Sequence, residues 1–317
     1  MATATQPHLG IYFDLGEFPT DYAAATAFRR PEPHGWRDIL AKARLAEELG
    51  FDSVWVPDHL IFGADEGVPE GFWECTGILA ALAATTERIG LGALVACAAF
   101  RSPALLAKVT DTIDEISGGR LTLGLGAGFY EPEFRAFGYP FDRLAGRFDE
   151  ALQIIHGLLR HGAVDFEGRF YSVRECELRP RGPRPDGPPL LIAARGPRTM
   201  RLAAQYGDLW NEVFVNAEPD HLTRLRELSA RLDEACASVG REPGTLGRSA
   251  AVFVQPRPGA GDEWQRDGQL ISGPPAGIAR FVGELTEAGV SHVIFIVAPQ
   301  SIEGIAAMAP VLEELGR

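Results

Sequence analysis

A histidine at the end of an apolar run is the first candidate for proton chemistry. In "WVPDHL", Asp58 and His59 directly follow a short run that is typical of a buried strand. An imidazole at this position can donate or accept a hydrogen bond near neutral pH. The alternative interpretation is a structural hydrogen bond between His59 and a carboxylate. We expect no metal here, because the sequence has no H-x-H, no H-E-x-x-H and no convergent Cys/His spacing.

Glycines gather at the end of a second apolar run, "RLTLGLGAGFYEPEF" at 120–134. Gly124 and Gly126 match the start of the dinucleotide fingerprint G-x-G-x-x-G, but Phe129 stands where the third glycine is required. The fingerprint therefore fails, and the phosphate-loop and nucleophile-elbow motifs are absent as well. Missing side chains at the end of a strand let a flat ring approach the backbone. For Gly124, relief of crowding inside a barrel is an equal alternative.

A third stretch has the outline of an anion site. In "PLLIAARGPRTM", a short apolar strand runs into Arg195 and Gly196, and Pro197 then opens a helix. The N–H groups and dipole at a helix N-terminus attract phosphate, and Arg195 or Arg198 can add charge-assisted contacts. By contrast, we interpret Glu131 and Glu133 as part of a solvated loop rather than as an acid/base pair.

The elements that position these residues alternate between strand and helix patterns along the whole chain, which predicts an α/β fold with a parallel sheet. The count indicates a single (β/α)8 TIM barrel over residues 1–317, with insertion loops at its C-terminal face. The candidate strands are Leu9–Phe13, Ser53–Val56, Ile89–Val95, Leu121–Leu125, Leu190–Ala194, Asp208–Val213, Ala250–Val254 and His292–Val297.

One helix carries clear start and stop signals in "RSPALLAKVTDTIDEISGG". Ser102 is the predicted N-cap, Pro103 suits the first turn, and glycines at 118 and 119 end the helix. We expect its buried stripe to contain Leu105, Leu106, Val109, Ile113 and Ile116. Three long segments do not fit a minimal barrel and are predicted to be loops or insertions, with a small hairpin around Gly168: Asp14–Gly35, Val164–Pro189 and Gln255–Pro275.

Composition excludes several classes of partner. The net charge of −13 disfavours a duplex-binding surface, so we expect no nucleic acid. No apolar stretch approaches the roughly 20 residues that span a bilayer, and the first residues do not resemble a signal peptide, so we expect no membrane and a cytoplasmic location. The four cysteines form no C-x-x-C pair and are predicted to be reduced.

Four stretches in this order carry a family resemblance: "LAEELGFDSVWVPDHL", "TTERIGLGALV", "FRSPALLAKVTDTIDEISGGRLTLGLGAGFYEPEFRAFGYPF" and "PLLIAARGPRTMRLAAQYGDLWN". The chain resembles the bacterial luciferase-like monooxygenase superfamily, in particular its F420-dependent oxidoreductase branch. The resemblance is close over 9–211 and extends to the last third only through the β-α pattern. It implies a TIM barrel that binds a deazaflavin (F420) or FMN at its mouth, usually as a homodimer.

The resemblance also implies roles for particular residues. The bond between Leu94 and Val95 matches the non-proline cis peptide on which the ring leans in such proteins. His59 matches the histidine near the reactive face of the ring. The backbone wall beside the cofactor matches Gly126, Ala127 and Gly128, and the phosphate grip matches Arg195 and Gly196.

The chain departs from the F420-dependent sugar-phosphate dehydrogenases at two places. Gly63 and Phe129 stand where those enzymes have a tryptophan and an acidic residue. This departure argues against sugar-phosphate oxidation. Instead, Phe129, Tyr130 and Phe134 suggest an apolar pocket for a hydrophobic organic substrate.

Three hypotheses follow from the sequence. The first is an F420-dependent oxidoreductase that moves a hydride between deazaflavin and a small, fairly apolar molecule, with His59 orienting or polarising the reacting groups. The second is an FMN-dependent monooxygenase that receives reduced flavin from a partner reductase. The third is a protein that binds a flavin or deazaflavin without turnover.

Overall fold

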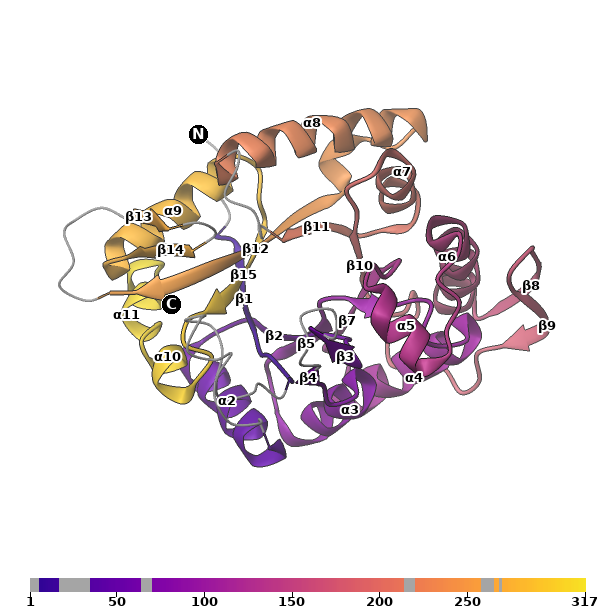
Figure 1. Cartoon of the computed structure of the whole chain (residues 1–317), viewed down its shortest axis with the longest axis horizontal. Helices are drawn as coiled ribbons and strands as arrows, with labels where there is room; N and C mark the ends of the chain where they lie inside the picture. Colours follow the sequence, from indigo (N-terminus) through magenta and orange to yellow (C-terminus); the bar gives the residue numbers. More distant parts are fainter. Residues whose placement is uncertain (1–5, 17–34, 64–69, 214–219, 258–264, 268–269) are drawn as a thin grey trace.

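The chain folds into a closed cylinder of parallel strands surrounded by helices (Figure 1). The computed structural model describes residues 6–16, 35–63, 70–213, 220–257, 265–267 and 270–317. Pairing of β11 with both β10 and β12 closes the ring, so the predicted TIM barrel is confirmed. Its eight strands are β1 (His8–Tyr12), β2 (Ser53–Val56), β5 (Gly90–Ala93), β7 (Leu121–Gly126), β10 (Leu190–Ala193), β11 (Leu209–Val213), β12 (Gly247–Pro256) and β15 (His292–Val297).

All eight predicted strands occur, and two of them, β2 and β15, have the predicted bounds. The main difference is β12, which is longer than expected at both ends. Its C-terminal part leaves the barrel and pairs with β14 (Leu270–Gly273), which also pairs with β13 (Gln265–Asp267). The predicted loop at 255–275 is therefore wrong in part, because some of it extends the sheet. Residues 258–264 and 268–269 of that segment lie outside the described residues.

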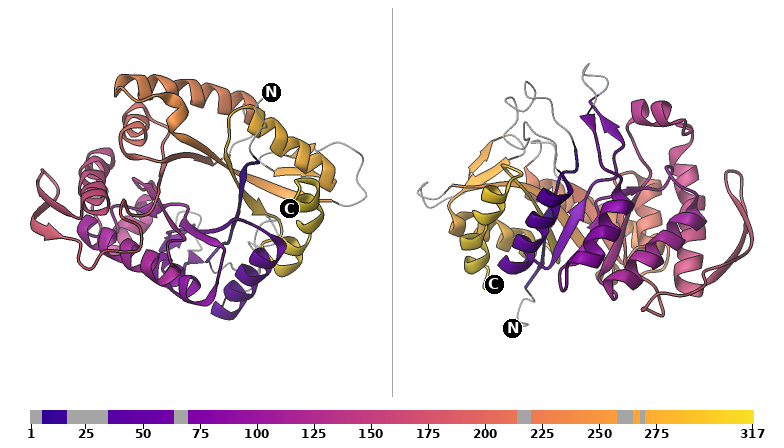
Figure 2. Two further views of the ribbon diagram at one scale, coloured as in Figure 1. Left: turned by 180° about the vertical axis from the view of Figure 1, so that it is seen from behind. Right: turned by 90° about the horizontal axis from the view of Figure 1, so that it is seen from below.

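Helices cover the outside of the barrel (Figure 2). None of those in the described part of the chain combines the length and apolar character needed to cross a membrane. The helices are α2 (Trp36–Leu49), α3 (Cys75–Thr85), α4 (Pro103–Ser117), α5 (Glu131–Phe137), α6 (Leu144–His161), α7 (Pro197–Tyr206), α8 (His221–Ser238), α9 (Pro275–Glu287), α10 (Ile302–Ala306) and α11 (Ala309–Glu314), with the short 3-10 helix η2 (Pro243–Thr245).

The buried face of α4 differs from the predicted stripe. Leu105 and Ile116 are 55% and 46% exposed, although Leu106 and Ile113 are buried as expected. The inward face instead includes Asp114, which accepts a hydrogen bond from Leu121 N–H and pairs with an arginine. A buried polar side chain is tolerated when it is hydrogen-bonded, and this is why the apolar stripe alone gave the wrong face. Pro103 and Gly118 bound the helix as predicted, but Ser102 forms no side-chain cap.

The remaining strands lie outside the barrel or at its rim. The hairpin predicted around Gly168 is formed by β8 (Ala163–Glu167) and β9 (Ser172–Glu177), which extend away from the barrel (Figure 2). Two short strands, β3 (Ile61–Phe62) and β4 (Glu70–Gly71), pair with each other after β2, and β6 (Ala96–Cys97) pairs with β7. Residues 17–34 of the predicted first loop lie outside the described residues.

The N-terminal end of the barrel contains a buried histidine. His292 is 3% exposed, its Nδ1 lies 3.2 Å from Ser249 Oγ, and its ring contacts those of His8 and Trp55. Burial, with a smaller contribution from His8, lowers the pKa of His292 to about 3. His292 is therefore neutral in the folded protein near neutral pH.

His292 should make the fold sensitive to acid. The unfolded chain takes up a proton on this residue below about pH 6.5, while the folded chain resists protonation, so stability falls as pH falls through this range. Between about pH 7.5 and about pH 5 the loss attributable to His292 is about 2 kcal/mol. Denaturant unfolding at both pH values should show a His292→Asn variant losing less stability than the wild type. Equal losses in the two proteins would contradict this assignment.

Candidate functional site

A single cavity of about 860 Å³ opens at the C-terminal mouth of the barrel. Its size is in the range of cofactor and ligand sites, and its walls come from the ends of most of the barrel strands. All eight residues that the sequence marked as a site line this cavity: His59, Leu94, Val95, Gly126, Ala127, Gly128, Arg195 and Gly196. Residues more than 130 positions apart in the chain thus meet in one place.

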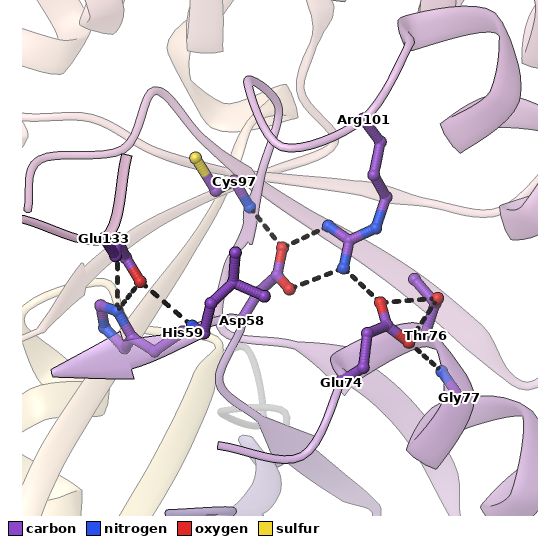
Figure 3. A network of polar contacts seen from close by, with 9 residues as sticks. Asp58, His59, Glu74, Thr76, Gly77, Cys97, Arg101 and Glu133 are labelled. Carbon is purple, nitrogen blue, oxygen red and sulfur yellow. Dashed lines mark hydrogen bonds and ion pairs between the residues drawn. The ribbon is translucent and has the colours of Figure 1, made fainter. Parts of the chain in front are cut away.

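The loop that carries His59 is anchored by Asp58 (Figure 3). The buried carboxylate of Asp58 accepts hydrogen bonds from Cys97 N–H at 2.9 Å and from both terminal nitrogens of Arg101 at 2.6 and 2.8 Å. Arg101 also pairs with Glu74, which caps α3 through Gly77 N–H. Asp58 therefore fixes the end of β2 to the segment after β5 and does not bond His59.

The partner of His59 is Glu133 (Figure 3). Its carboxylate oxygens lie 3.2 and 3.4 Å from His59 Nδ1, and one of them accepts the Leu60 N–H at 3.1 Å. Glu133 lies in the first turn of α5 and is 2% exposed. The expectation of a solvated loop is therefore wrong for Glu133, although Glu131 is exposed. Pro132, which favours the first turn of a helix, was the one local signal that α5 begins here.

Aromatic rings surround the rest of the imidazole. The centroids of Phe62, Phe72 and Phe129 lie 5.0, 5.6 and 5.7 Å from that of His59. Phe129 is 69% exposed and faces the cavity, as the sequence suggested. Tyr130 and Phe134 are buried behind this wall and do not line the cavity, so the expectation that they shape the pocket directly is wrong.

The opposite wall is shaped by close approach of the backbone. The peptide bond between Leu94 and Val95 is cis, as the resemblance implied. A Cβ on Gly124 would lie 1.9 Å from the Ala93 carbonyl oxygen, so Gly124 is required by packing inside the barrel. A Cβ on Gly126 would meet only the Val95 side chain, at 2.7 Å, and both residues line the cavity. The packing alternative is therefore correct for Gly124, while Gly126 makes room for the Val95 side chain in the cavity wall.

The predicted anion site lies where β10 leads into α7. Arg195 lines the cavity, but its Nε already donates to the buried Glu212 at 2.9 Å and its Nη2 to the Val213 carbonyl at 2.6 Å. Glu212 also accepts from Arg224 at 3.2 Å. Because two arginines surround one carboxylate, this group of side chains gives a net positive charge at this end of the cavity. No local pattern marks Glu212 as part of the site, because its partners lie in the turn after the adjacent strand β10 and on α8.

Gly196 is the N-cap of α7, and its N–H donates to Thr199 Oγ1 at 3.2 Å. The N–H groups of the first helical turn have no acceptor within a helix, so this end of α7 presents donors and a positive dipole to the cavity. Elsewhere in the cavity, burial raises the pKa of the Cys97 thiol to about 12, so it is not a ready nucleophile. Among the described residues, no group of His, Cys, Asp and Glu is arranged to hold a metal ion.

Comparison with known proteins gives the family. The sequence profile of the luciferase-like monooxygenase family matches residues 11–292. The chain belongs to this family. Among solved structures, an F420-dependent secondary alcohol dehydrogenase in complex with an F420-acetone adduct superposes with a TM-score of 0.76 over 98% of this chain and 99% of the other, at 17% identity. At that identity the match supports the luciferase-like barrel fold alone.

Several curated proteins are more similar in sequence. A 5,10-methylenetetrahydromethanopterin reductase from Archaeoglobus fulgidus is 33% identical over 62% of this chain and 54% of its own length. An F420-dependent glucose-6-phosphate dehydrogenase from Beutenbergia cavernae is 39% identical over 54% and 51%, and the pyrimidine monooxygenase RutA from Allorhizobium ampelinum is 30% identical over 56% and 50%. The chain thus spans about half the length of these relatives, which include luciferase-like F420 enzymes and a monooxygenase.

The two glycines of the wall should respond differently to alanine. Gly124→Ala forces a methyl group against a backbone oxygen and should cost about 3 kcal/mol of unfolding free energy or more. Gly126→Ala meets only a methyl group of Val95, which can shift more easily than the backbone does, so it should cost about 1–2 kcal/mol. The added methyl group should nonetheless weaken binding of a flavin-like ring about tenfold. Thermal unfolding and ligand titration of both variants measure these effects, and equal stability losses would refute the distinction.

Proposed function

We propose that the protein is an F420-dependent oxidoreductase that transfers a hydride between deazaflavin and a small, fairly apolar organic substrate. The observation that carries the proposal is the shared cavity, in which His59, the Val95 and Gly126 wall and the N-terminus of α7 face one space. The curated F420-dependent relatives support deazaflavin as the cofactor. When bound, the deazaflavin supplies the carbon that gives or takes the hydride.

The residues present fit such a cofactor at both ends. The glycine at 126 lets the Val95 side chain pack against bare backbone, and both residues line the cavity as a low wall that suits a flat ring. At the other end, Arg195 and the first turn of α7 combine positive charge with N–H donors, which suits a phosphate. Leu94, Ala127, Gly128 and Gly196 complete the proposed binding surface between these two ends.

The substrate side of the cavity is proposed to lie around His59. The three phenylalanine rings near the imidazole favour an apolar molecule beside the reacting atoms. Phe129 and Gly63 also remain the two departures from the sugar-phosphate dehydrogenases, so we do not extend the substrate of the Beutenbergia cavernae relative to this chain. His59 is the residue that we propose to orient or polarise the reacting group.

An FMN-dependent monooxygenase that receives reduced flavin from a reductase is the second candidate, and the RutA relative is the observation that favours it. The same wall and anion site would accept the FMN ring and its phosphate. A protein that binds either ring without turnover is the third candidate. These functions differ in which ring binds and in whether oxygen is consumed.

Titration of the purified chain with F420 and with FMN separates these candidates. We expect F420 to stabilise the protein, by about 2.7 kcal/mol at a hundredfold excess over its Kd, and FMN to do so less at equal concentration. Thermal unfolding and F420 fluorescence measure the effect, with the Gly126→Ala variant as the weakened control. A shift with FMN alone would replace this proposal by the monooxygenase, provided that oxygen uptake with reduced FMN follows. A shift with neither ring would reject both enzymes.

We also propose that the chain forms a homodimer through the outer faces of α3 and α4. The sequence of α3, "CTGILAALAAT", contains no charged residue, and a helix that is apolar all round is normally covered. The exposed Leu105 and Ile116 continue this apolar surface on α4, which packs beside α3. A second copy is the fitting occupant, because the uncharged face of α3 can meet its own copy across a two-fold axis even in a chain of charge −13.

Charge placed on this surface should separate the subunits. Leu105→Lys combined with Ile116→Lys puts four positive charges into a two-fold interface and should weaken association at least about tenfold. Sedimentation velocity over a range of concentrations measures the change. Phe137→Lys, at an exposed phenylalanine on α5, is the matched control and should leave association unchanged. A wild-type protein that sediments as a monomer at all concentrations would show that this surface has another role.

A further inference from the structure

Glu133 faces two groups of a single loop. One carboxylate oxygen accepts the backbone N–H of Leu60, and both oxygens lie within 3.4 Å of His59 Nδ1. The loop follows β2, whereas Glu133 comes from α5 after β7, more than 70 residues later in the chain. The carboxylate is 2% exposed, so these contacts replace most of the water it would otherwise bind.

The chemistry of the three groups fixes where hydrogen atoms can lie. The Leu60 amide is an obligatory donor, so the oxygen facing it must accept. An ionised carboxylate accepts only, and it therefore requires a hydrogen on His59 Nδ1. In a neutral imidazole with the hydrogen on Nδ1, the other nitrogen, Nε2, carries the lone pair.

The side chains around His59 leave its Nε2 atom facing the cavity. Glu133 is the polar partner recorded for the ring among the described residues, and Phe62, Phe72 and Phe129 pack around it. His59 itself lines the cavity. Phenylalanine rings offer no strong donor or acceptor, so within the described part of the chain Nε2 is left for a molecule bound in the cavity.

We infer that Glu133 is a positioning residue that holds His59 as the Nδ1–H tautomer and presents Nε2 to the cavity as a hydrogen-bond acceptor. The group that best meets such an acceptor is a substrate hydroxyl. The role of this acceptor in a reaction rests on the proposed function. The tautomer of His59 is set by contacts within the folded protein and does not depend on that function. The adjacent anchor at Asp58 holds the same loop from the other side, so the imidazole has a fixed orientation as well as a fixed hydrogen.

Glutamine at position 133 gives a sharp test, because it has one acceptor and one donor. If its oxygen keeps the Leu60 N–H, its amide NH2 occupies the place of the other oxygen and must donate to His59 Nδ1. The tautomer then inverts, and the hydrogen moves to Nε2. The opposite orientation sets the NH2 against the Leu60 N–H and loses that hydrogen bond, so it is disfavoured.

The tautomer is measured by long-range 1H–15N correlation spectra of the full-length chain labelled with 15N-histidine, without cofactor or substrate. Spectra run from about pH 7 to about pH 9.5, where imidazoles become neutral. A His59→Gln variant identifies the signals of His59. Wild type and the control Glu131→Gln, at the exposed glutamate of the same helix turn, should show Nδ1–H in at least about tenfold excess. Glu133→Gln should reverse this ratio.

Two results would overturn the inference: an Nε2–H tautomer in the wild type, or a folded Glu133→Gln variant whose tautomer ratio equals that of Glu131→Gln. If Glu133→Gln does not fold, Glu133→Asp takes its place, because a side chain shorter by one methylene cannot reach both His59 and Leu60. That variant should lose the tenfold excess, and an unchanged ratio in it counts against the inference. If F420 does not bind, the proposed function is rejected, but the tautomer measured without cofactor is unaffected. Failure of the proposed function can therefore be told apart from failure of this inference.

Discussion

Pairing between the first and last strands of the barrel is the constraint on which the site depends. β1 pairs with β15 in parallel, from His8 opposite His292 to Ile11 opposite Phe295, and β15 pairs in turn with β12. Because every barrel strand runs in the same direction, closure brings all the carboxyl ends to one rim. The loop with His59 and the turn with Arg195 then share one cavity, although no contact within either segment specifies the other.

The rim is held together by side chains that bridge different βα units, and Glu133 even reaches past β5, which lies between β7 and β2. Asp58 holds the segment after β5, Glu133 reaches back from β7 to β2, and Glu212 joins β11 to the turn after β10. Each bond joins elements that the closed barrel already brings close at its rim, so its cost in chain entropy is small once the barrel has formed. The barrel brings the loops at its rim close to one another. Hydrogen bonds to the buried carboxylates then stabilise one arrangement of these loops.

The sequence predicted the parts of this structure that depend on local patterns. Apolar runs bounded by glycine or polar residues gave all eight strands, and their ends placed His59 and Arg195 at the mouth. Predictions failed where burial of a polar group decides the outcome, as at Glu133 and at Asp114 on the inner face of α4. No local pattern marks a carboxylate for burial, because its hydrogen-bond partners lie on other elements of the fold.

The groups that face the cavity have partners behind them, and this arrangement bears on ligand binding. His59 is held by Glu133 and Arg195 by Glu212, so folding has already restricted both side chains before any ligand arrives. A flexible arginine or an unrestrained histidine would lose that freedom on binding, at about 0.5–1.5 kcal/mol for each side chain. Glu133 and Glu212 line the cavity themselves, but their oxygens are already engaged with the residues that they hold. Their contribution is to keep the His59 imidazole and the Arg195 guanidinium in place. Side chains held in this way on a rigid barrel form a binding site with fixed geometry.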